Sequence, residues 1–212
     1  MTTWGIVVAA GSGTRFGGAK QYEQLGAQRV LDWAVQALRP FCDGVVLVVS
    51  EGHAARHEPG VDAVVTGGST RSESVRAGLA AVPAEADIVV VHDAVRPLAS
   101  PHLFEAVVGA VVAGADGAVP GVPVSDTVKR VGEGCLVIET LDRSQLVAVQ
   151  TPQAFRTRTL RGAHGVGADT TDDAALVESA GGRVVVVPGD PANIKLTAPH
   201  DLVVAEALLA TK

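Results

Sequence analysis

Residues 6–20 read IVVAAGSGTRFGGAK, a short apolar run that leads into a glycine-rich loop with two cations. The apolar residues predict a buried strand, and loop glycines let backbone N–H groups approach a phosphate closely. Arg15 and Lys20 add positive charge within the same loop. The stretch therefore indicates a strand that ends in a turn at which a phosphate-bearing ligand binds.

Two common phosphate-binding motifs do not fit this loop. The dinucleotide fingerprint G-x-G-x-x-G requires a third glycine where Phe16 stands, and the acid expected about 20 residues later would be Asp32, inside a predicted amphipathic helix. A P-loop requires Ser or Thr after its lysine, whereas Gln21 follows Lys20. A triphosphate held by backbone N–H groups and two cations fits better. The alternative is a tight turn with solvated basic residues.

Composition narrows the class of protein. The 212 residues are 47% hydrophobic and 3% aromatic, which predicts one domain over residues 1–212 with a core of Val, Ala, Leu and Ile. The net charge of −6 without a clustered basic face argues against a nucleic-acid partner. The sequence shows neither a membrane-length apolar run nor a signal-peptide pattern, and its two cysteines are isolated. We therefore expect a cytoplasmic protein that binds no membrane.

Strand and helix patterns alternate along the chain. Val-rich runs at 4–9, 44–49, 61–65, 87–91, 116–120 and 183–188 predict buried parallel strands. Helical patterns are expected at about 28–39, 70–81, 101–113, 171–180 and 199–210, with Pro101 at a helix start and Gly181-Gly182 at a helix end. This alternation predicts an α/β fold of Rossmann-like type, with a mostly parallel sheet, helices on both faces and ligands at the carboxyl ends of the strands.

Residues 123–149 interrupt the alternation and read as strand, Gly-Glu-Gly turn, strand. A long hairpin inserted into such a sheet cannot bury both of its faces on its own domain, and an isolated two-stranded ribbon is marginally stable. The segment is therefore predicted to be a β-arm that packs on another chain. A flap over its own site is the alternative.

Polar residues follow several predicted strands. Asp93 comes just after the run 87–91, where a carboxylate can hold a magnesium ion that bridges phosphate oxygens, although it could also cap the next helix. The loop TGGSTRSESV at 66–75 opens a helix and can accept a base or phosphate; its alternative is an ordinary cap by Ser69 or Thr70 with Glu73. QTPQAF at 150–155, TTDDAAL at 170–176 and ANIKLT at 192–197 add further polar groups.

Taken together, these motifs resemble one enzyme family. AAGSGTR, KQY, GGSTRSESV, VHDAVRP, DTVKR, LDR, QTPQAF, TDDAAL and NIKLT, in this order from residue 4 to about 205, are similar to the 2-C-methyl-D-erythritol 4-phosphate cytidylyltransferase family. The resemblance implies a nucleotidyltransferase fold, a homodimer joined by β-arms, and a need for Mg²⁺. It also implies the reaction of CTP with methylerythritol phosphate to give CDP-methylerythritol and pyrophosphate, in the non-mevalonate synthesis of isoprenoid precursors.

The resemblance also assigns residues. For CTP it implies a site lined by Ala9, Ala10, Gly11, Gly13, Gly67, Gly68 and Ser74. For catalysis it implies Arg15 and Lys20 on the triphosphate together with Arg143 and Lys195 on the attacking phosphate, and for the metal it implies Asp93. For the sugar phosphate it implies Arg96, Thr127, Arg143, Thr171 and Lys195, with Thr127 and Arg143 supplied by the partner's arm.

The chain departs from the family pattern at a few positions. Ala19 stands before the lysine where the family usually has proline, which could leave Lys20 more mobile, and Val95 stands where many members have alanine. Ala192 replaces a frequent acid, so that Asp190 is the nearby candidate for a second metal ligand.

The implied chemistry requires no general base, because a phosphate monoester with a second pKa of about 6 is largely dianionic at pH 7. We therefore assign none, although His92 adjoins Asp93. Two other functions remain open at this stage. One is a cytidylyltransferase for another polyol phosphate, such as ribitol 5-phosphate, and the other is a non-catalytic nucleotide-binding regulator.

Overall fold

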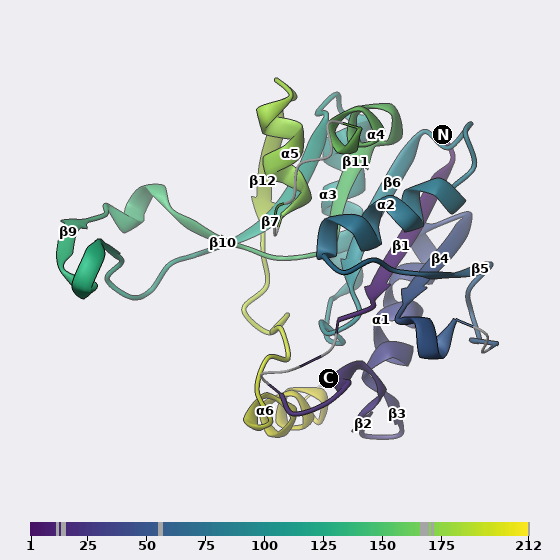
Figure 1. The fold of residues 1–212 in the computed structure, drawn as a ribbon, viewed down its shortest axis with the longest axis horizontal. Helices are drawn as coiled ribbons and strands as arrows, with labels where there is room; N and C mark the ends of the chain where they lie inside the picture. Colours follow the sequence, from purple (N-terminus) through teal and green to yellow (C-terminus); the bar gives the residue numbers. More distant parts are fainter. Residues whose placement is uncertain (12, 14–15, 55–56, 166–169, 171, 212) are drawn as a thin grey trace.

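The computed structural model describes residues 1–11, 13, 16–54, 57–165, 170 and 172–211. These residues form an eight-stranded sheet with helices on both faces, from which a long arm projects (Figure 1). The strands are β1 (Thr3–Ala9), β2 (Gln24–Leu25), β3 (Gln28–Arg29), β4 (Gly44–Val49), β5 (Ala63–Thr66), β6 (Ile88–Asp93), β7 (Gly117–Pro123), β8 (Lys129–Val131), β9 (Val137–Thr140), β10 (Val147–Val149), β11 (Gln153–Arg156) and β12 (Val184–Pro188). The helices are α1 (Val30–Leu38), α2 (Arg71–Ala81), α3 (Pro101–Val112), α4 (Thr157–His164), α5 (Asp173–Ser179) and α6 (His200–Leu209).

The sheet is mostly parallel. Its strand order is β10-β7-β11-β6-β1-β4-β5, and β12 also pairs with β7. β1 runs parallel to β4 and β6, β4 to β5, and β12 to β7, whereas β10 and β11 are antiparallel to their neighbours. The predicted α/β fold is confirmed, and its strands and five predicted helices lie at the expected places.

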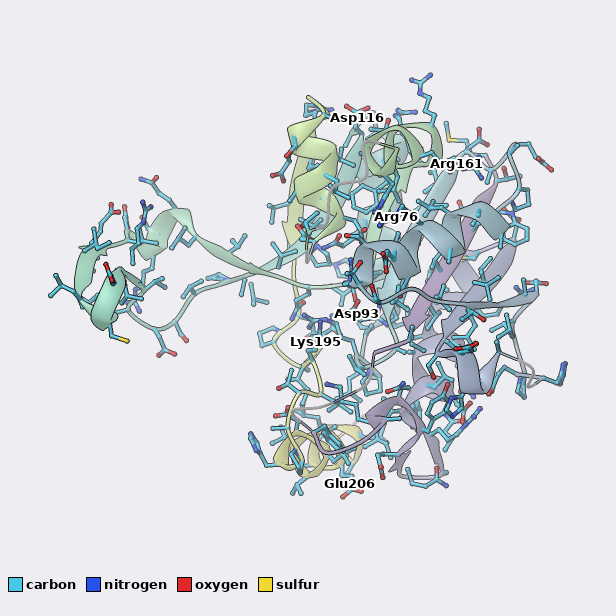
Figure 2. The ribbon with its side chains drawn as sticks, in the orientation of Figure 1. Arg76, Asp93, Asp116, Arg161, Lys195 and Glu206 are labelled. Atoms are coloured by element: carbon cyan, nitrogen blue, oxygen red, sulfur yellow. The ribbon has the colours of Figure 1, made fainter. Side chains whose placement is uncertain are left out.

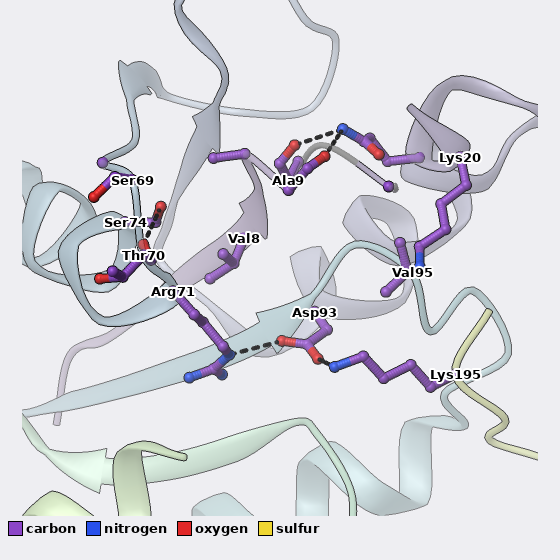
Figure 3. Close-up of a pocket in the computed structure, with 15 residues that line it drawn as sticks. Val8, Ala9, Lys20, Ser69, Thr70, Arg71, Ser74, Asp93, Val95 and Lys195 are labelled. Carbon is purple, nitrogen blue, oxygen red and sulfur yellow. Dashed lines mark hydrogen bonds and ion pairs between the residues drawn. The ribbon is translucent and has the colours of Figure 1, made fainter. Parts of the chain in front are cut away.

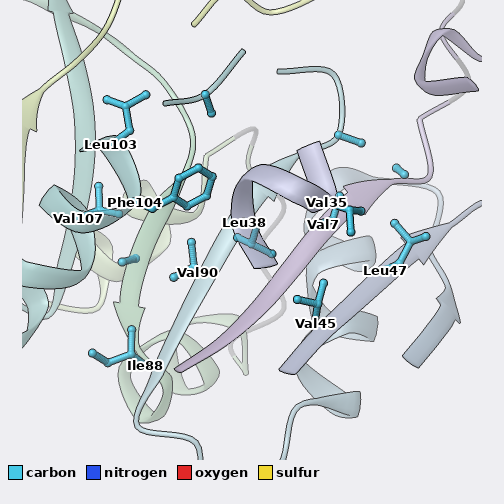
Figure 4. Packing of buried hydrophobic residues seen from close by; sticks show 14 of the residues in the cluster. Val7, Val35, Leu38, Val45, Leu47, Ile88, Val90, Leu103, Phe104 and Val107 are labelled. Atoms are coloured by element: carbon cyan, nitrogen blue, oxygen red, sulfur yellow. The ribbon is translucent and has the colours of Figure 1, made fainter. Parts of the chain in front are cut away.

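Both faces of the sheet are covered, which explains why its strands are continuous apolar runs rather than alternating ones. On one face, α1 and α3 pack on Val7, Val45 and Val90 (Figure 4). On the other face, α2, α4 and α5 pack on the alternate residues of the same strands, among them Ile6 and Val46. A smaller third cluster joins α6 to the β2–β3 hairpin.

Two helix ends follow the chemistry expected from the sequence. Pro101 is the first residue of α3, after an extended Ser100. Gly181 adopts a φ of +82°, and the N–H groups of Gly181 and Gly182 donate to the carbonyls of Glu178 and Val177. This Schellman arrangement ends α5 and turns the chain into β12.

Helix α4, strand β11 and the β2–β3 hairpin were not expected from the sequence. β11 and α4 together span only twelve residues, from Gln153 to His164, and strand and helix follow each other with no glycine or proline between them. The hairpin turns through Gly26, whose φ is +62°. These elements are too short for a period of 2 or 3.6 to be recognised.

The inserted hairpin is present as an arm that extends away from the sheet (Figure 1). β8 and β9 pair antiparallel, and a short turn at Glu133–Cys135 connects them. β10 returns the chain to the sheet beside β7. An arm with this direction does not fit the alternative of a flap over its own site.

Candidate active site

A pocket of about 510 Å³ lies at the carboxyl ends of β1 and β6, as expected for a parallel sheet. Its lining residues are Val8, Ala9, Ala10, Gly11, Gly13, Lys20, Gln21, Gly68, Ser69, Thr70, Arg71, Ser74, Asp93, Val95 and Lys195 (Figure 3). The structure thus brings together all but one of the residues implied for CTP. The exception is Gly67, which lies next to the lining residues Ala10 and Ser74.

The glycine-rich loop after β1 folds back on Gly13. The Gly13 carbonyl accepts N–H groups from Phe16 at 2.8 Å and Gly17 at 3.0 Å. Gly13 has a φ of +66°, and a Cβ there would lie 1.8 Å from the Gly18 carbonyl oxygen. No residue with a side chain fits this position.

Gln21 fixes the entrance to the same loop and was not singled out in the sequence. Its side chain is 2% exposed, and its Nε2 donates to the carbonyl oxygens of Ala9 at 2.8 Å and Gly11 at 3.2 Å. Lys20, its neighbour, lines the pocket (Figure 3). The sequence signal for Gln21 is its place directly after the loop lysine.

Ala19 adopts a φ of −76°, which lies in the range that a proline ring imposes. The backbone before Lys20 therefore has the φ that proline would fix, although the chain lacks proline here. Arg15, the other expected loop cation, lies outside the described residues.

The loop after β5 both caps α2 and lines the pocket. Thr70 Oγ1 accepts the Glu73 N–H at 3.1 Å, and the Glu73 carboxylate accepts the N–H of Thr70 at 3.1 Å. The capping-box alternative is therefore correct for this turn, while Gly68 and Ser74 still face the pocket. A Cβ on Gly67 would lie 2.5 Å from the Ala10 Cβ, so glycine lets the two pocket loops approach each other.

Asp93 lies between two cations at the end of β6. Its Oδ2 accepts Lys195 Nζ at 2.7 Å, and its Oδ1 accepts Arg71 Nε at 3.3 Å (Figure 3). Burial raises the pKa of Asp93, but the charges of Arg71 and Lys195 outweigh it and hold the pKa well below its usual range. The alternative role as a helix cap is wrong, because α3 begins only at Pro101.

Arg71 is a central site residue that the sequence analysis left without a role. Besides Asp93, it binds Asp173 Oδ2 at 2.6 Å, and Asp173 Oδ1 in turn contacts His164 Nε2 at 3.0 Å. As the first residue of α2, Arg71 points from the helix start toward β6. Only its place after the glycine pair could have suggested a site role.

A second pocket of about 220 Å³ adjoins the first and shares Arg71, Asp93 and Lys195 with it. Its other lining residues are Arg96, Val149, Gln150, Thr151, Gln153 and Asp172. The structure thus places Arg96 and Lys195, both implied for the sugar phosphate, around one cavity. Thr171 lies outside the described residues.

The segment that carries Lys195 is held by side chains from two other loops, one after β6 and one between β10 and β11. Arg96 Nη1 donates to the Asn193 carbonyl at 2.7 Å, and Gln150 Nε2 donates to the Asp190 carbonyl at 2.8 Å. The carboxylate of Asp190 accepts the Ala192 N–H at 2.8 Å and lines neither pocket. Asp190 therefore caps its own turn, and its geometry gives no support for a role as second metal ligand.

His92 is not positioned to act as a general base at this site. It is fully buried, and its ring nitrogens lie 3.2 Å from the Arg96 carbonyl and 3.1 Å from Thr151 Oγ1. Burial lowers the pKa of His92 to about 4, which keeps the ring neutral at pH 7. Both ring nitrogens are thus occupied inside the protein, and His92 belongs to the described lining of neither pocket.

Thr127 and Arg143 belong to the arm. The arm extends away from the body that carries Asp93 and Lys195 (Figure 2). Both are exposed, neither belongs to the described lining of the two adjoining pockets, and Arg143 donates a hydrogen bond to the Ser125 carbonyl. The arm thus brings Arg143 close to the segment that carries Thr127. Within one chain, Thr127 and Arg143 therefore do not reach the two pockets.

The chain matches the family model described as IspD, 2-C-methyl-D-erythritol 4-phosphate cytidylyltransferase, over residues 4–211. It is 46% identical over 231 residues to the 2-C-methyl-D-erythritol 4-phosphate cytidylyltransferase of Streptomyces coelicolor, covering 99% of this chain and 86% of that protein. The chain belongs to the 2-C-methyl-D-erythritol 4-phosphate cytidylyltransferase family.

Two further cytidylyltransferase relatives define the fold and the extent of the match. The crystal structure of the 2-C-methyl-D-erythritol 4-phosphate cytidylyltransferase from Thermus thermophilus has a TM-score of 0.84 at 35% identity and covers 99% of this chain and 100% of that one. The chain is also 45% identical over 220 residues to a bifunctional enzyme IspD/IspF of Clavibacter michiganensis. The match covers 97% of this chain and 54% of that longer protein. The resemblance to the family is therefore confirmed, and the chain is a nucleotidyltransferase rather than a non-catalytic regulator.

In the described part of the chain, no helix combines the length and the apolar character that crossing a bilayer requires. Within the same residues, no three Asp, Glu, His or Cys side chains gather as a ready-made metal site.

Proposed function

We propose that this member of the cytidylyltransferase family transfers the cytidylyl group of CTP to 2-C-methyl-D-erythritol 4-phosphate. The products are CDP-methylerythritol and pyrophosphate, and the reaction belongs to the non-mevalonate synthesis of isoprenoid precursors. The observation that carries the proposal is the pair of adjoining pockets with Arg71, Asp93 and Lys195 between them. Two substrates bound on either side of these charges would meet at their phosphates.

The larger pocket suits CTP. Its lining includes the small residues Ala9, Ala10 and Gly68. Gly11, Gly13 and Lys20 line this pocket, and Lys20 would supply charge for the triphosphate. We place the cytosine near the small residues and the phosphates toward Lys20, with Arg15 as a second phosphate ligand.

The smaller pocket suits the polyol phosphate, because cations stand at its border with the CTP pocket. Lys195 and Arg71 are placed to hold the attacking phosphate, and Arg96 lines the same cavity. The phosphate is its own nucleophile, so positioning and charge neutralisation account for the rate. Lys20 offsets charge that develops on the α-phosphate during the attack.

Asp93 fits a role as a magnesium ligand. Mg²⁺ is commonly bound by one or two carboxylates together with substrate phosphates and water, so that a single acid suffices. The low pKa of Asp93, caused by Arg71 and Lys195, keeps its carboxylate ionised and able to bind a cation. The ion would supply neutralisation of charge on the leaving pyrophosphate.

The arm accounts for the remaining residues if a second copy of the chain binds it. Val131, Leu136, Val137 and Ile138 on the arm are 57%, 72%, 54% and 65% exposed, an apolar surface that a partner chain would cover. In such a homodimer, Thr127 and Arg143 of one chain would complete the acceptor pocket of the other. The free thiols Cys42 and Cys135 are consistent with the cytoplasmic location that forms part of this proposal.

A two-acceptor assay tests the proposed reaction. Purified chain is mixed with CTP, Mg²⁺ and either methylerythritol phosphate or ribitol 5-phosphate, and pyrophosphate release and the CDP-linked product are measured. We expect rapid turnover with methylerythritol phosphate and at most slow turnover with ribitol 5-phosphate. A preference for ribitol 5-phosphate would show that this polyol phosphate is the acceptor. The absence of pyrophosphate release with both acceptors would refute the transferase role.

A further inference from the structure

Gln153 lines the smaller pocket and carries a buried polar atom without a partner among the described residues. The side chain is 2% exposed, and this atom is its Oε1. A buried acceptor left unsatisfied costs about 1–3 kcal/mol, so its retention calls for an explanation.

The strand direction explains how Gln153 reaches the site. β11 is antiparallel to β6, and Gln153, its first residue, pairs with Val91 near the end of β6. Because β11 runs antiparallel to its neighbours β6 and β7, it starts at the edge of the sheet where those two strands end. Gln153 therefore stands beside the loops that line the two pockets, while Ala154 and Phe155 are buried in the sheet.

The orientation of the amide follows from its neighbours. Nε2 donates to Asp172 Oδ1 at 2.7 Å and to the Gln150 carbonyl at 3.4 Å. An ionised carboxylate and a carbonyl can only accept, so both contacts require the NH₂ group of Gln153 on that side. The amide oxygen is thereby fixed on the opposite side, without a donor.

The chemistry of this oxygen selects which part of a substrate can approach it. A phosphate dianion has no hydrogen to donate, so it would repel Oε1, whereas a hydroxyl group can donate to it. A complementary donor is present, because Arg96 lines the same pocket and its Nε is also buried without a partner. An acceptor and a donor around one small cavity suit a hydroxyl group, which both donates and accepts.

We propose that Gln153 is a specificity-determining residue whose Oε1 accepts a hydrogen bond from one hydroxyl of the polyol phosphate. This inference rests on the proposed function and adds the orientation of the acceptor. The phosphate lies toward Arg71 and Lys195, and a hydroxyl of the carbon chain lies toward Gln153 and Arg96. Asp172 acts as the positioning residue that holds the amide in the productive orientation.

The test combines Gln153→Met with acceptors that lack one hydroxyl. Methionine keeps the length of the side chain and removes its acceptor. With saturating CTP, kcat/KM is measured for methylerythritol phosphate and for its three analogues in which the C1, C2 or C3 hydroxyl is replaced by hydrogen. Gln153→Met should lower kcat/KM for the full acceptor about 10- to 100-fold and leave the KM for CTP unchanged.

The decisive readout is the coupling between the side chain and one hydroxyl. The wild-type chain should discriminate against one deoxy analogue, and that discrimination should disappear in Gln153→Met. Thr157→Val is the matched control, because Thr157 Oγ1 is likewise buried without a partner but lines neither pocket. The control should keep wild-type kinetics with all four acceptors.

Two outcomes would overturn the inference. One is an equal fall in kcat/KM for all four acceptors in Gln153→Met, which would make the residue merely structural. The other is equal use of full and deoxy acceptors by the active wild-type chain, a result that needs no variant to fold. Failure of the wild-type chain to use any polyol phosphate would instead contradict the proposed function, so the two failures are distinguishable.

Discussion

Lys195 Nζ lies 2.7 Å from Asp93 Oδ2, although 102 residues separate the two along the chain. Arg71 approaches the other oxygen of the same carboxylate at 3.3 Å. One buried anion thus orders two cations that face both pockets. The charges that the proposed reaction requires are fixed by Asp93 before any substrate binds.

Removing this anion should affect stability and metal use together. Asp93→Asn leaves Arg71 and Lys195 without their shared partner, and we expect the free energy of unfolding to fall by about 2–3 kcal/mol. The loss is limited because Lys195 is partly exposed and water can solvate its charge. The Mg²⁺ concentration for half-maximal rate should rise at least about tenfold. Denaturant unfolding and metal titration of the rate measure both effects.

Glu206→Gln, an exposed residue on α6, serves as the control for Asp93→Asn and should change neither quantity. An unchanged Mg²⁺ requirement in Asp93→Asn would show that Asp93 only arranges the two cations. A fall in stability alone would thus contradict its role as a metal ligand.

The loop lysine should act on the transition state more than on binding. Lys20→Ala removes a donor near the place where charge develops on the α-phosphate, which typically lowers kcat about 10²- to 10³-fold. The affinity for CTP, measured by calorimetry without the acceptor, should change much less. Weaker CTP binding with unchanged turnover would make Lys20 only a binding residue.

Much of the fold follows from the sequence, because long apolar runs and helix caps are local signals. β1, β4 and β6 each contain an uninterrupted apolar run, and Gly181 ends α5 through its own φ angle. β11 gave no such signal, since four residues are too few to show a period. Its antiparallel insertion between β6 and β7 is a property of the whole sheet.

Site residues that belong to a sequence motif could be predicted. Residues whose role depends on contacts between distant segments could not. Asp93 and Lys195 were expected from their motifs, but the sequence could not show that they contact each other. The role of Arg71 depends on Asp173, 102 residues away, and that of Gln153 on Asp172, which orients its amide. Such contacts arise only when separate elements pack together.

The small residues of the larger pocket, proposed to bind CTP, predict the base. Ala9, Ala10 and Gly68 line it, and a Cβ on the neighbouring Gly67 would already overlap Ala10. A purine needs more room, so kcat/KM for CTP should exceed that for ATP and GTP by about 100-fold or more. Initial rates with each nucleotide and methylerythritol phosphate measure this ratio. Comparable rates with ATP would contradict the placement of the base.

Completion of each site by the arm of a second chain is the central claim, and mixed dimers of two inactive variants test it most directly. Lys20→Ala damages the body of a chain, and Arg143→Ala damages its arm. In a mixed dimer with exchanged arms, one site carries both lesions and the other carries neither. Random pairing should therefore restore about a quarter of wild-type activity.

A mixture of Lys20→Ala and Lys195→Ala is the matched control for that measurement, because both lesions lie in the body and every site keeps one of them. Pyrophosphate release by co-expressed and purified mixed dimers is compared for the two pairs of variants. Recovery near a quarter for Lys20→Ala with Arg143→Ala, and none for the control pair, is the predicted result. Activity that stays at the level of the single variants in both mixtures would contradict the shared site.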